Sequence, residues 1–170
     1  MCIIIAKPRG AKMPPFDIIQ NCARRNPDGF GFATVAGVYK SMDFYNFYKH
    51  LQQVPEDSAL IIHFRYATHG SLKRANCHPF RDPKSGVSFA HNGVLNIAPN
   101  KDMTDSETAF RGLYVPVLRK YGLDSDELRK EVTRTIGGSR FAFLGPEGRI
   151  RLFGHFFEYK GCWFSNTNFL

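Results

Sequence analysis

Apolar positions along this 170-residue chain follow two patterns, short continuous runs and stripes with helical spacing. Continuous apolar runs bounded by turn residues are typical of buried strands. Such runs occupy residues 2–6, 30–35, 59–68, 86–93, 139–144, 149–154, 155–159 and 162–166. The run ALIIHFRYAT at 59–68 is the strongest of them, so it predicts the clearest strand of the chain.

Four segments carry apolar residues three and four positions apart, which predicts amphipathic helices. They cover residues 14–26, 43–54, 104–122 and 124–138. Thr104 with Glu107, and Asp124 with Glu127, have the spacing of a capping box, so we expect Thr104 and Asp124 to begin their helices. Pro116 lies inside the third helix and is expected to kink it.

The order of these elements favours an α+β fold in a single domain over residues 1–170. The apolar strands alternate poorly with helices, which argues against a doubly wound parallel sheet. The chain contains 16 phenylalanines, and aromatic residues make up 14% of it. Two sheets packed face to face, with helices outside, would bury this many aromatic side chains.

The formal net charge is +8, which allows a nucleic acid or an acidic protein as a partner. The basic residues are scattered in separate stretches and form no cluster interleaved with aromatic residues, so nucleic-acid binding is the less favoured explanation. The apolar runs are too short to span a membrane, and the first residues lack the pattern of a signal peptide. We therefore expect a cytoplasmic protein without membrane contact.

The cysteines are widely spaced and include no CxxC pair. They are Cys2, Cys22, Cys77 and Cys162. A cytosolic chain is not expected to form disulfides, so we expect the last three to be structural. A zinc site would have to combine Cys77 with His63, His69 and His78. This set matches none of the usual structural zinc spacings, so we expect no metal site.

Cys2 has two interpretations. It is either a small apolar residue that opens a strand, or a nucleophile that becomes the first residue once Met1 is removed. In the second case its own α-amine can act as the base, because the pKa of an α-amino group lies at about 7.7–8.0. The dipeptide alone does not decide between them.

The stretch HFRYATHGS at residues 63–71 places an arginine at the end of a buried strand. Arg65 could clamp a carboxylate through two parallel hydrogen bonds, and Thr68 and His69 could bind the same anion. The alternative is an arginine paired with a structural aspartate or glutamate.

Two further polar stretches have a structural and a functional interpretation. Asn92 and Gly93 form an Asn-Gly pair, which is first of all a turn signal. The Asn92 amide and the Gly93 N–H could instead stabilise an oxyanion. Asp105 could simply sit in the first turn of a helix, or it could hold a substrate ammonium group.

These stretches occur in an order that resembles class II glutamine amidotransferase domains. The motifs are MC at the start, RNPDGFGFA, HFRYATHG, CHPF, HNGVLN, TDSE and the closing GCWFSN. Each is short, but their order from residue 2 to the C-terminus is specific. The family consists of N-terminal-nucleophile hydrolases, so the resemblance implies a four-layer αββα sandwich of two mostly antiparallel sheets.

The resemblance also implies a reaction. Cys2 would attack the side-chain amide of glutamine, form a γ-glutamyl thioester and release ammonia, with Asn92 and Gly93 as the oxyanion hole. Arg25 and Asp28 match a turn of the family near the nucleophile and would support it. We expect no cofactor for this chemistry.

The same resemblance implies how glutamine is held. Arg65 would bind the α-carboxylate, with Thr68 and His69 beside it, and Asp105 would hold the α-amine. Ile3 differs from the family, which usually has glycine there, and could crowd the site or pack beneath it. No synthase domain follows residue 170, so we expect ammonia to pass to a synthase partner on another chain.

Two other functions remain open from the sequence. The same machinery could hydrolyse another γ-glutamyl compound or small amide. Alternatively, the chain could keep the fold without the chemistry and bind a protein or nucleic acid through its basic surface.

Overall fold

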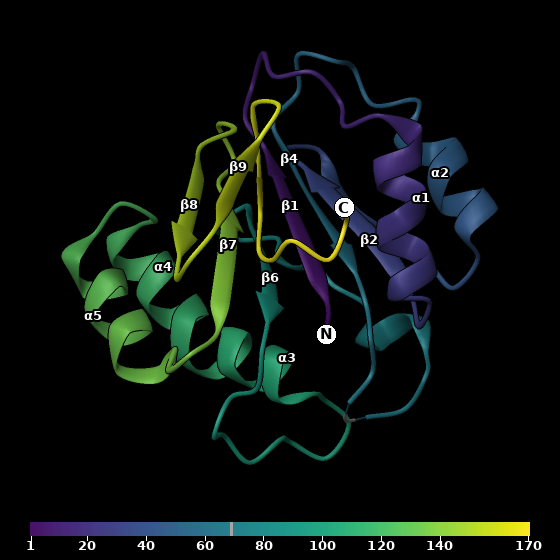
Figure 1. Ribbon diagram of the computed structural model, residues 1–170. Helices are drawn as coiled ribbons and strands as arrows, with labels where there is room; N and C mark the ends of the chain where they lie inside the picture. Colours follow the sequence, from purple (N-terminus) through teal and green to yellow (C-terminus); the bar gives the residue numbers. More distant parts are fainter. Residues whose placement is uncertain (69) are drawn as a thin grey trace.

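The computed structural model describes residues 1–68 and 70–170, and its strands form two antiparallel sheets packed face to face (Figure 1). The first sheet contains, in spatial order, β3 (Gly37–Ser41), β2 (Phe30–Thr34), β4 (Leu60–Phe64), β1 (Ile3–Lys7), β10 (Cys162–Phe164) and β9 (Phe157–Tyr159). The second contains β5 (Phe80–Asp82), β6 (Val87–Asn92), β7 (Arg140–Leu144) and β8 (Ile150–Phe153). The predicted α+β class is therefore confirmed.

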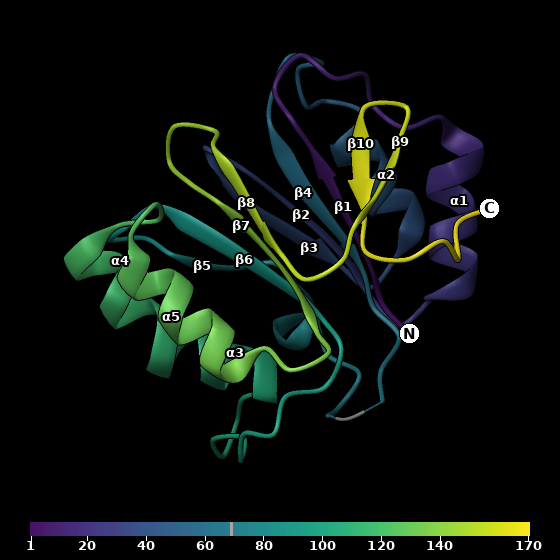
Figure 2. The same ribbon diagram turned by 60° about the vertical axis from the view of Figure 1, so that its left-hand side comes forward.

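Helices cover the outer face of each sheet, which completes the four layers (Figure 2). The first sheet is covered by α1 (Phe16–Arg25) and α2 (Phe44–Leu51). The second is covered by α3 (Asp105–Ala109), the π-helical turn η2 (Phe110–Tyr114), α4 (Val115–Tyr121) and α5 (Asp126–Thr135). A short 3₁₀ turn, η1 (Arg74–Asn76), precedes β5.

The strand β1 is apolar from Ile3 to Ala6 because both of its faces are buried. Ile3 and Ile5 pack with the helix residues of α1 and α2, whereas Ile4 and Ala6 pack against the second sheet. A strand covered on both sides reads as a continuous apolar run instead of an alternating one. This strand therefore lies at the centre of the sandwich, with Cys2 at its open end.

Two of the expected element details differ from the structure. The helix predicted over 104–122 is interrupted by η2, which ends two residues before Pro116, whose missing N–H cannot continue the ladder. Asp124 does not begin the last helix. The Ser125 side chain accepts the N–H of Leu128 at 3.2 Å instead, and Asp124 binds Arg151 at 2.5 Å. The expected cap at Thr104 is confirmed.

The strands β3 and β5 were not predicted from the sequence. Each lies at an edge of its sheet and mixes polar with apolar residues, as GVYKS and FRD show.

Within the described part of the chain, no helix has both the length and the apolar character needed to cross a bilayer.

Candidate active site

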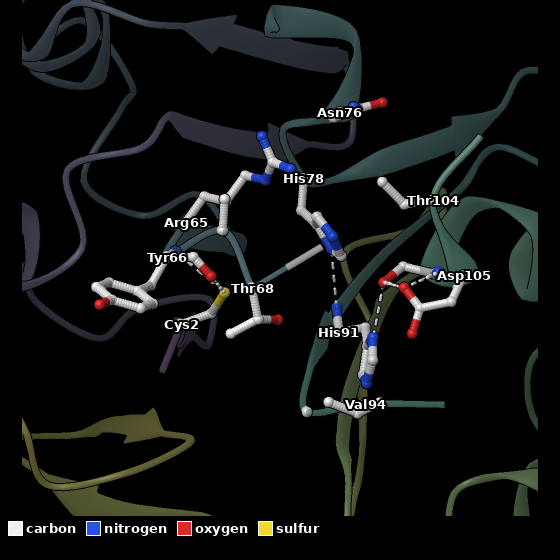
Figure 3. Close-up of a pocket in the computed structure, with 13 residues that line it drawn as sticks. Cys2, Arg65, Tyr66, Thr68, Asn76, His78, His91, Val94, Thr104 and Asp105 are labelled. Atoms are coloured by element: carbon white, nitrogen blue, oxygen red, sulfur yellow. Dashed lines mark hydrogen bonds between the residues drawn. The ribbon is translucent and has the colours of Figure 1, made fainter. Parts of the chain in front are cut away.

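A pocket lies at the open end of the sandwich, where β1 begins and β4 and β6 end (Figure 3). Five of the predicted residues line it, namely Cys2, Arg65, Thr68, Gly93 and Asp105. They come from both sheets and from the start of α3, so the fold brings together groups that are up to a hundred positions apart in the sequence.

The thiol of Cys2 is held by the backbone that follows β4. Its Sγ accepts the N–H of Tyr66 at 3.2 Å, and its carbonyl accepts the Nδ2 of Asn166 at 2.8 Å. Burial raises the pKa of this thiol above its usual range, although the Tyr66 backbone, the chain terminus and Arg65 oppose the shift. A thiol that is neutral at working pH needs a base before it can attack a carbonyl.

Arg65 is nearly buried, with 4% of its surface exposed, and it lines the pocket. One of its terminal nitrogens donates to the carbonyl of Ser71 at 3.0 Å. Its backbone N–H donates to the carbonyl of Gly29 at 2.8 Å, and its own carbonyl accepts the N–H of Asp28 at 2.9 Å. These bonds hold the residue in place at the strand end.

Asp28 supports the same loop with its side chain. Its carboxylate accepts the N–H of Ala67 at 2.8 Å, so it orients the backbone between Arg65 and Thr68. Arg25 does not line the pocket, and its guanidinium donates to the carbonyl of Leu170 at 3.0 Å. Thr68 lies at the exposed rim, and His69 lies outside the described residues.

The two predicted oxyanion residues have different positions. Gly93 lines the pocket with a φ of +138°, and a Cβ there would lie 2.4 Å from the Oγ of Ser139, so only glycine fits. Asn92 is buried, and its Nδ2 donates to the Oγ of Ser165 at 2.9 Å. One amide proton of Asn92 is thus used by a structural bond, and one is left.

Asp105 presents a fixed carboxylate to the pocket. One oxygen accepts the N–H of Leu95 at 3.0 Å, and the other accepts the N–H of Ser106 at 2.8 Å. An ionised carboxylate offers about four acceptor sites, so capacity remains for a cation.

Three buried histidines lie beside the pocket and were not singled out as site residues. The ring of His78 stacks on that of His63 with 4.1 Å between centroids, and the Nδ1 of His78 accepts the N–H of His91 at 3.0 Å. The His91 ring lies 2.7 Å from Ser106 Oγ and 2.9 Å from Ser139 Oγ. Their positions within HFRYATHG, CHPF and AHNG were the available signal.

Burial keeps these imidazoles neutral. It lowers the pKa of His63 to about 3 and that of His91 to about 4, although the backbone carbonyl of His91 and the carboxylate of Asp105, respectively, oppose the shifts. The pKa of His78 is lowered for the same reason. The network therefore supplies fixed dipoles to the pocket wall and no charge.

The enclosed part of the pocket measures about 50 Å³, well below the roughly 300–1,000 Å³ typical of small-molecule sites. Tyr66, Thr68 and Val94 form an exposed part of its rim. Among the described residues, no group of three or more metal-ligating side chains is arranged to hold an ion.

Comparison with known proteins agrees with this geometry. Residues 48–149, more than half of the chain, match the family described as class-II glutamine amidotransferases. The chain belongs to this family. The class II amidotransferase resembles two Saccharomyces cerevisiae proteins, from strains S288c and Lalvin EC1118, that are named as isomerizing glutamine–fructose-6-phosphate aminotransferases. It is 31% identical to each over 122 residues, which cover 62% of this chain and 46% and 39% of theirs.

The amidotransferase therefore spans less than half the length of these relatives. A solved structure, that of glutamine phosphoribosylpyrophosphate amidotransferase from B. subtilis, aligns with a TM-score of 0.61. The alignment covers 96% of this chain and 41% of the other at 16% identity. The predicted family and its layered architecture are confirmed.

Proposed function

We propose that this amidotransferase hydrolyses the side-chain amide of glutamine through Cys2 and releases ammonia. The observation that carries the proposal is the convergence of three groups on one pocket, the Cys2 thiol, the Arg65 guanidinium and the Asp105 carboxylate (Figure 3). A nucleophile flanked by a cation and an anion suits an amino acid whose side chain is to be attacked.

The two charged residues would hold the two ends of glutamine. Arg65 binds the α-carboxylate through its planar fork of N–H donors, with Thr68 and His69 beside it. Asp105 binds the α-ammonium, since its carboxylate is already oriented by two backbone N–H groups. The pocket would thereby discriminate against simple amides that lack either charge.

Removal of Met1 would expose the α-amine of Cys2 next to its own thiol. The amine takes the thiol proton as Sγ attacks the amide carbon, and the resulting tetrahedral intermediate expels ammonia once that proton reaches the leaving nitrogen. Water then attacks the γ-glutamyl thioester, which yields glutamate and regenerates the thiol. The elevated pKa of the buried thiol is the reason that such a base is needed.

The negative oxygen of the intermediate requires hydrogen-bond donors. The backbone N–H of Gly93 is one, and the second amide proton of Asn92 is the other, while the first stays on Ser165. Each donor of this kind contributes roughly 2.7–4 kcal/mol to acyl transfer.

Ile3 is compatible with this chemistry. Its side chain is fully buried in the cluster between the first sheet and α1, and it therefore packs beneath the site without entering the pocket.

We propose that the ammonia passes to a synthase partner on a separate chain in the cytoplasm.

Measurement of the ammonia and glutamate produced from glutamine tests the activity. We expect equal amounts of the two products, no turnover in Cys2→Ser, and full turnover in the matched control Cys162→Ala. A γ-glutamyl amide that is hydrolysed faster than glutamine would favour the wider amidohydrolase function, and turnover that persists in Cys2→Ser would contradict the proposal.

A further inference from the structure

A second hollow lies at the seam between the two sheets. It measures about 470 Å³, within the range of roughly 300–1,000 Å³ that small-molecule sites occupy. Its walls come from the edge strands β3 and β5, which contact each other, from η1 and from η2. It is distinct from the Cys2 pocket, and none of the described residues lines both.

The hollow is strongly basic. Four cationic side chains from four different elements line it, Lys40, Arg74, Arg81 and Arg111. No acidic side chain is among the described residues of its wall. Glu107 lies nearby and forms an ion pair with Arg111 at 2.8 Å, which offsets one of the four charges.

Lys40 carries its ammonium group in the part of the hollow next to Phe80. The nitrogen lies 4.3 Å from the centre of the Phe80 ring. No hydrogen bond from this ammonium to an oxygen occurs among the described residues. Burial lowers its pKa to about 8, although Glu107 opposes the shift. A partly desolvated ammonium held only by a ring gains from an anionic ligand.

Two of the arginines are held in place by backbone carbonyls. Arg81 donates to the carbonyl of Val35 at 3.3 Å, and Arg111 donates to the carbonyl of Arg81 at 3.4 Å. Each guanidinium has five N–H groups, so several donors remain after these bonds. The cations are therefore positioned before any ligand arrives.

We propose that this hollow binds a phosphate group, either free or as the monoester of a small molecule. Phosphate monoesters carry a charge of about −1.5 to −2 at neutral pH and three acceptor oxygens, which matches three uncompensated cations better than a single carboxylate does. A concave cavity also suits a small molecule. A nucleic acid would need a basic stripe along the surface, and the other basic residues of this chain are scattered.

The site shares a wall with the Cys2 pocket. Arg74 and Pro79 face the hollow, whereas Asn76 and His78 in the same segment face the pocket. Asn76 donates to the carbonyl of Ser71 at 3.0 Å, the same carbonyl that binds Arg65. A phosphorylated ligand would thus be separated by this wall from Arg65, the residue assigned to the glutamine carboxylate. Binding of that ligand in the hollow does not depend on hydrolysis of glutamine.

Calorimetric titration at constant ionic strength tests the proposal with three probes: inorganic phosphate, glycerol 3-phosphate and a 12-nucleotide single-stranded DNA. We expect saturable one-to-one binding of phosphate or its monoester, weakened about tenfold or more in Lys40→Gln and in Arg74→Gln. The control Lys130→Gln removes an exposed charge from α5 and should leave the affinity unchanged.

The comparison among probes identifies the ligand. Tighter binding of the ester indicates a phosphorylated small molecule, and equal affinity indicates free phosphate. Binding of the DNA alone, or equal losses in Lys130→Gln and Arg74→Gln, would overturn the proposal. Arg74 is exposed, so its variant tests the site even if Lys40→Gln fails to fold.

Acylation provides an independent readout. An amine with a lowered pKa is more often unprotonated near pH 8, so Lys40 should react faster than Lys130 with an amine-directed ester, and glycerol 3-phosphate should protect it. If saturating glycerol 3-phosphate leaves the acylation rate of Lys40 unchanged, the assignment of this hollow as a phosphate site is contradicted.

Discussion

The amide nitrogen of Asn92 donates a hydrogen bond to the hydroxyl of Ser165 at 2.9 Å, in the buried interior. The same hydroxyl accepts the backbone N–H of Ile4 at 2.8 Å. Ser165 therefore ties the end of β6, which carries the proposed oxyanion donors, to the strand that begins at Cys2. This side chain therefore links the strand of the nucleophile directly to the oxyanion site.

Ser165→Ala should lower both stability and activity. It leaves two buried donors without a partner, which costs about 1–3 kcal/mol per group, and it frees the Asn92 amide to turn. Urea denaturation measures the loss of unfolding free energy. The control Ser58→Ala alters a hydroxyl that takes part in none of the described hydrogen bonds, so it should stay within about 0.5 kcal/mol. Equal stability of both variants would contradict the role of Ser165.

Gly93→Ala should damage the site more than the fold. The added Cβ would meet Ser139 at 2.4 Å and displace the backbone N–H by forcing the two segments apart. We expect a loss of about 1–3 kcal/mol in stability and about 10²–10³-fold in kcat. In Gly112→Ala the new methyl group meets open space, so both quantities should stay near wild type. A fully active Gly93→Ala would exclude this N–H as a donor.

The buried histidines predict a loss of stability in acid. Their folded pKa values, about 3 for His63 and about 4 for His91, lie below the unfolded value of about 6.5. Their contribution is complete above pH 6.5 and declines as the pH falls towards 4, by about 1.4 kcal/mol per pH unit for each histidine.

Urea denaturation between pH 7.5 and 5 measures that slope. His63→Gln should reduce it by about one histidine's share, whereas the exposed control His155→Gln should not alter it. A free energy of unfolding that stays constant from pH 7 to 5 would show that these imidazoles are not held neutral.

Asp105→Asn tests recognition of the amino acid without changing the thiol. Loss of the negative charge should slow labelling of Cys2 by a glutamine-like electrophile about 10–100-fold, equivalent to roughly 1.5–3 kcal/mol for a charged hydrogen bond. Labelling by iodoacetamide should not slow, because that reagent lacks an α-ammonium group. The control Asp102→Asn changes an exposed carboxylate nearby. Equal slowing with both reagents would instead indicate a disturbed thiol.

The layered fold and five residues that line the pocket could be predicted from the sequence because each rests on a local pattern. The run CIIIA predicts β1, and the capping spacing at Thr104 predicts where α3 begins. The edge strands β3 and β5 escape prediction because partial exposure mixes their polarity. Asp124 has the correct spacing for a cap, but two arginines from β8 and its turn bind its carboxylate.

No local sequence pattern shows which residues that are far apart in the chain come together at the site. Nothing in the sequence indicates that Asn92 would be bound to Ser165, or that three histidines would stack and hydrogen-bond beside the pocket. These contacts depend on how the two sheets are offset, which is determined by packing of the small residues between them, such as Ala6, Ala90 and Ala142.

The central claim is that Cys2, freed of Met1, is a glutamine-directed nucleophile. Intact mass spectrometry of the purified protein, before and after treatment with a diazoketone analogue of glutamine, tests it directly when the labelled residue is mapped. We predict loss of Met1 and a single adduct on Cys2 that excess glutamine blocks. A processed chain that forms no adduct, or forms one at Cys22, Cys77 or Cys162 with Cys2 unmodified, would contradict the claim.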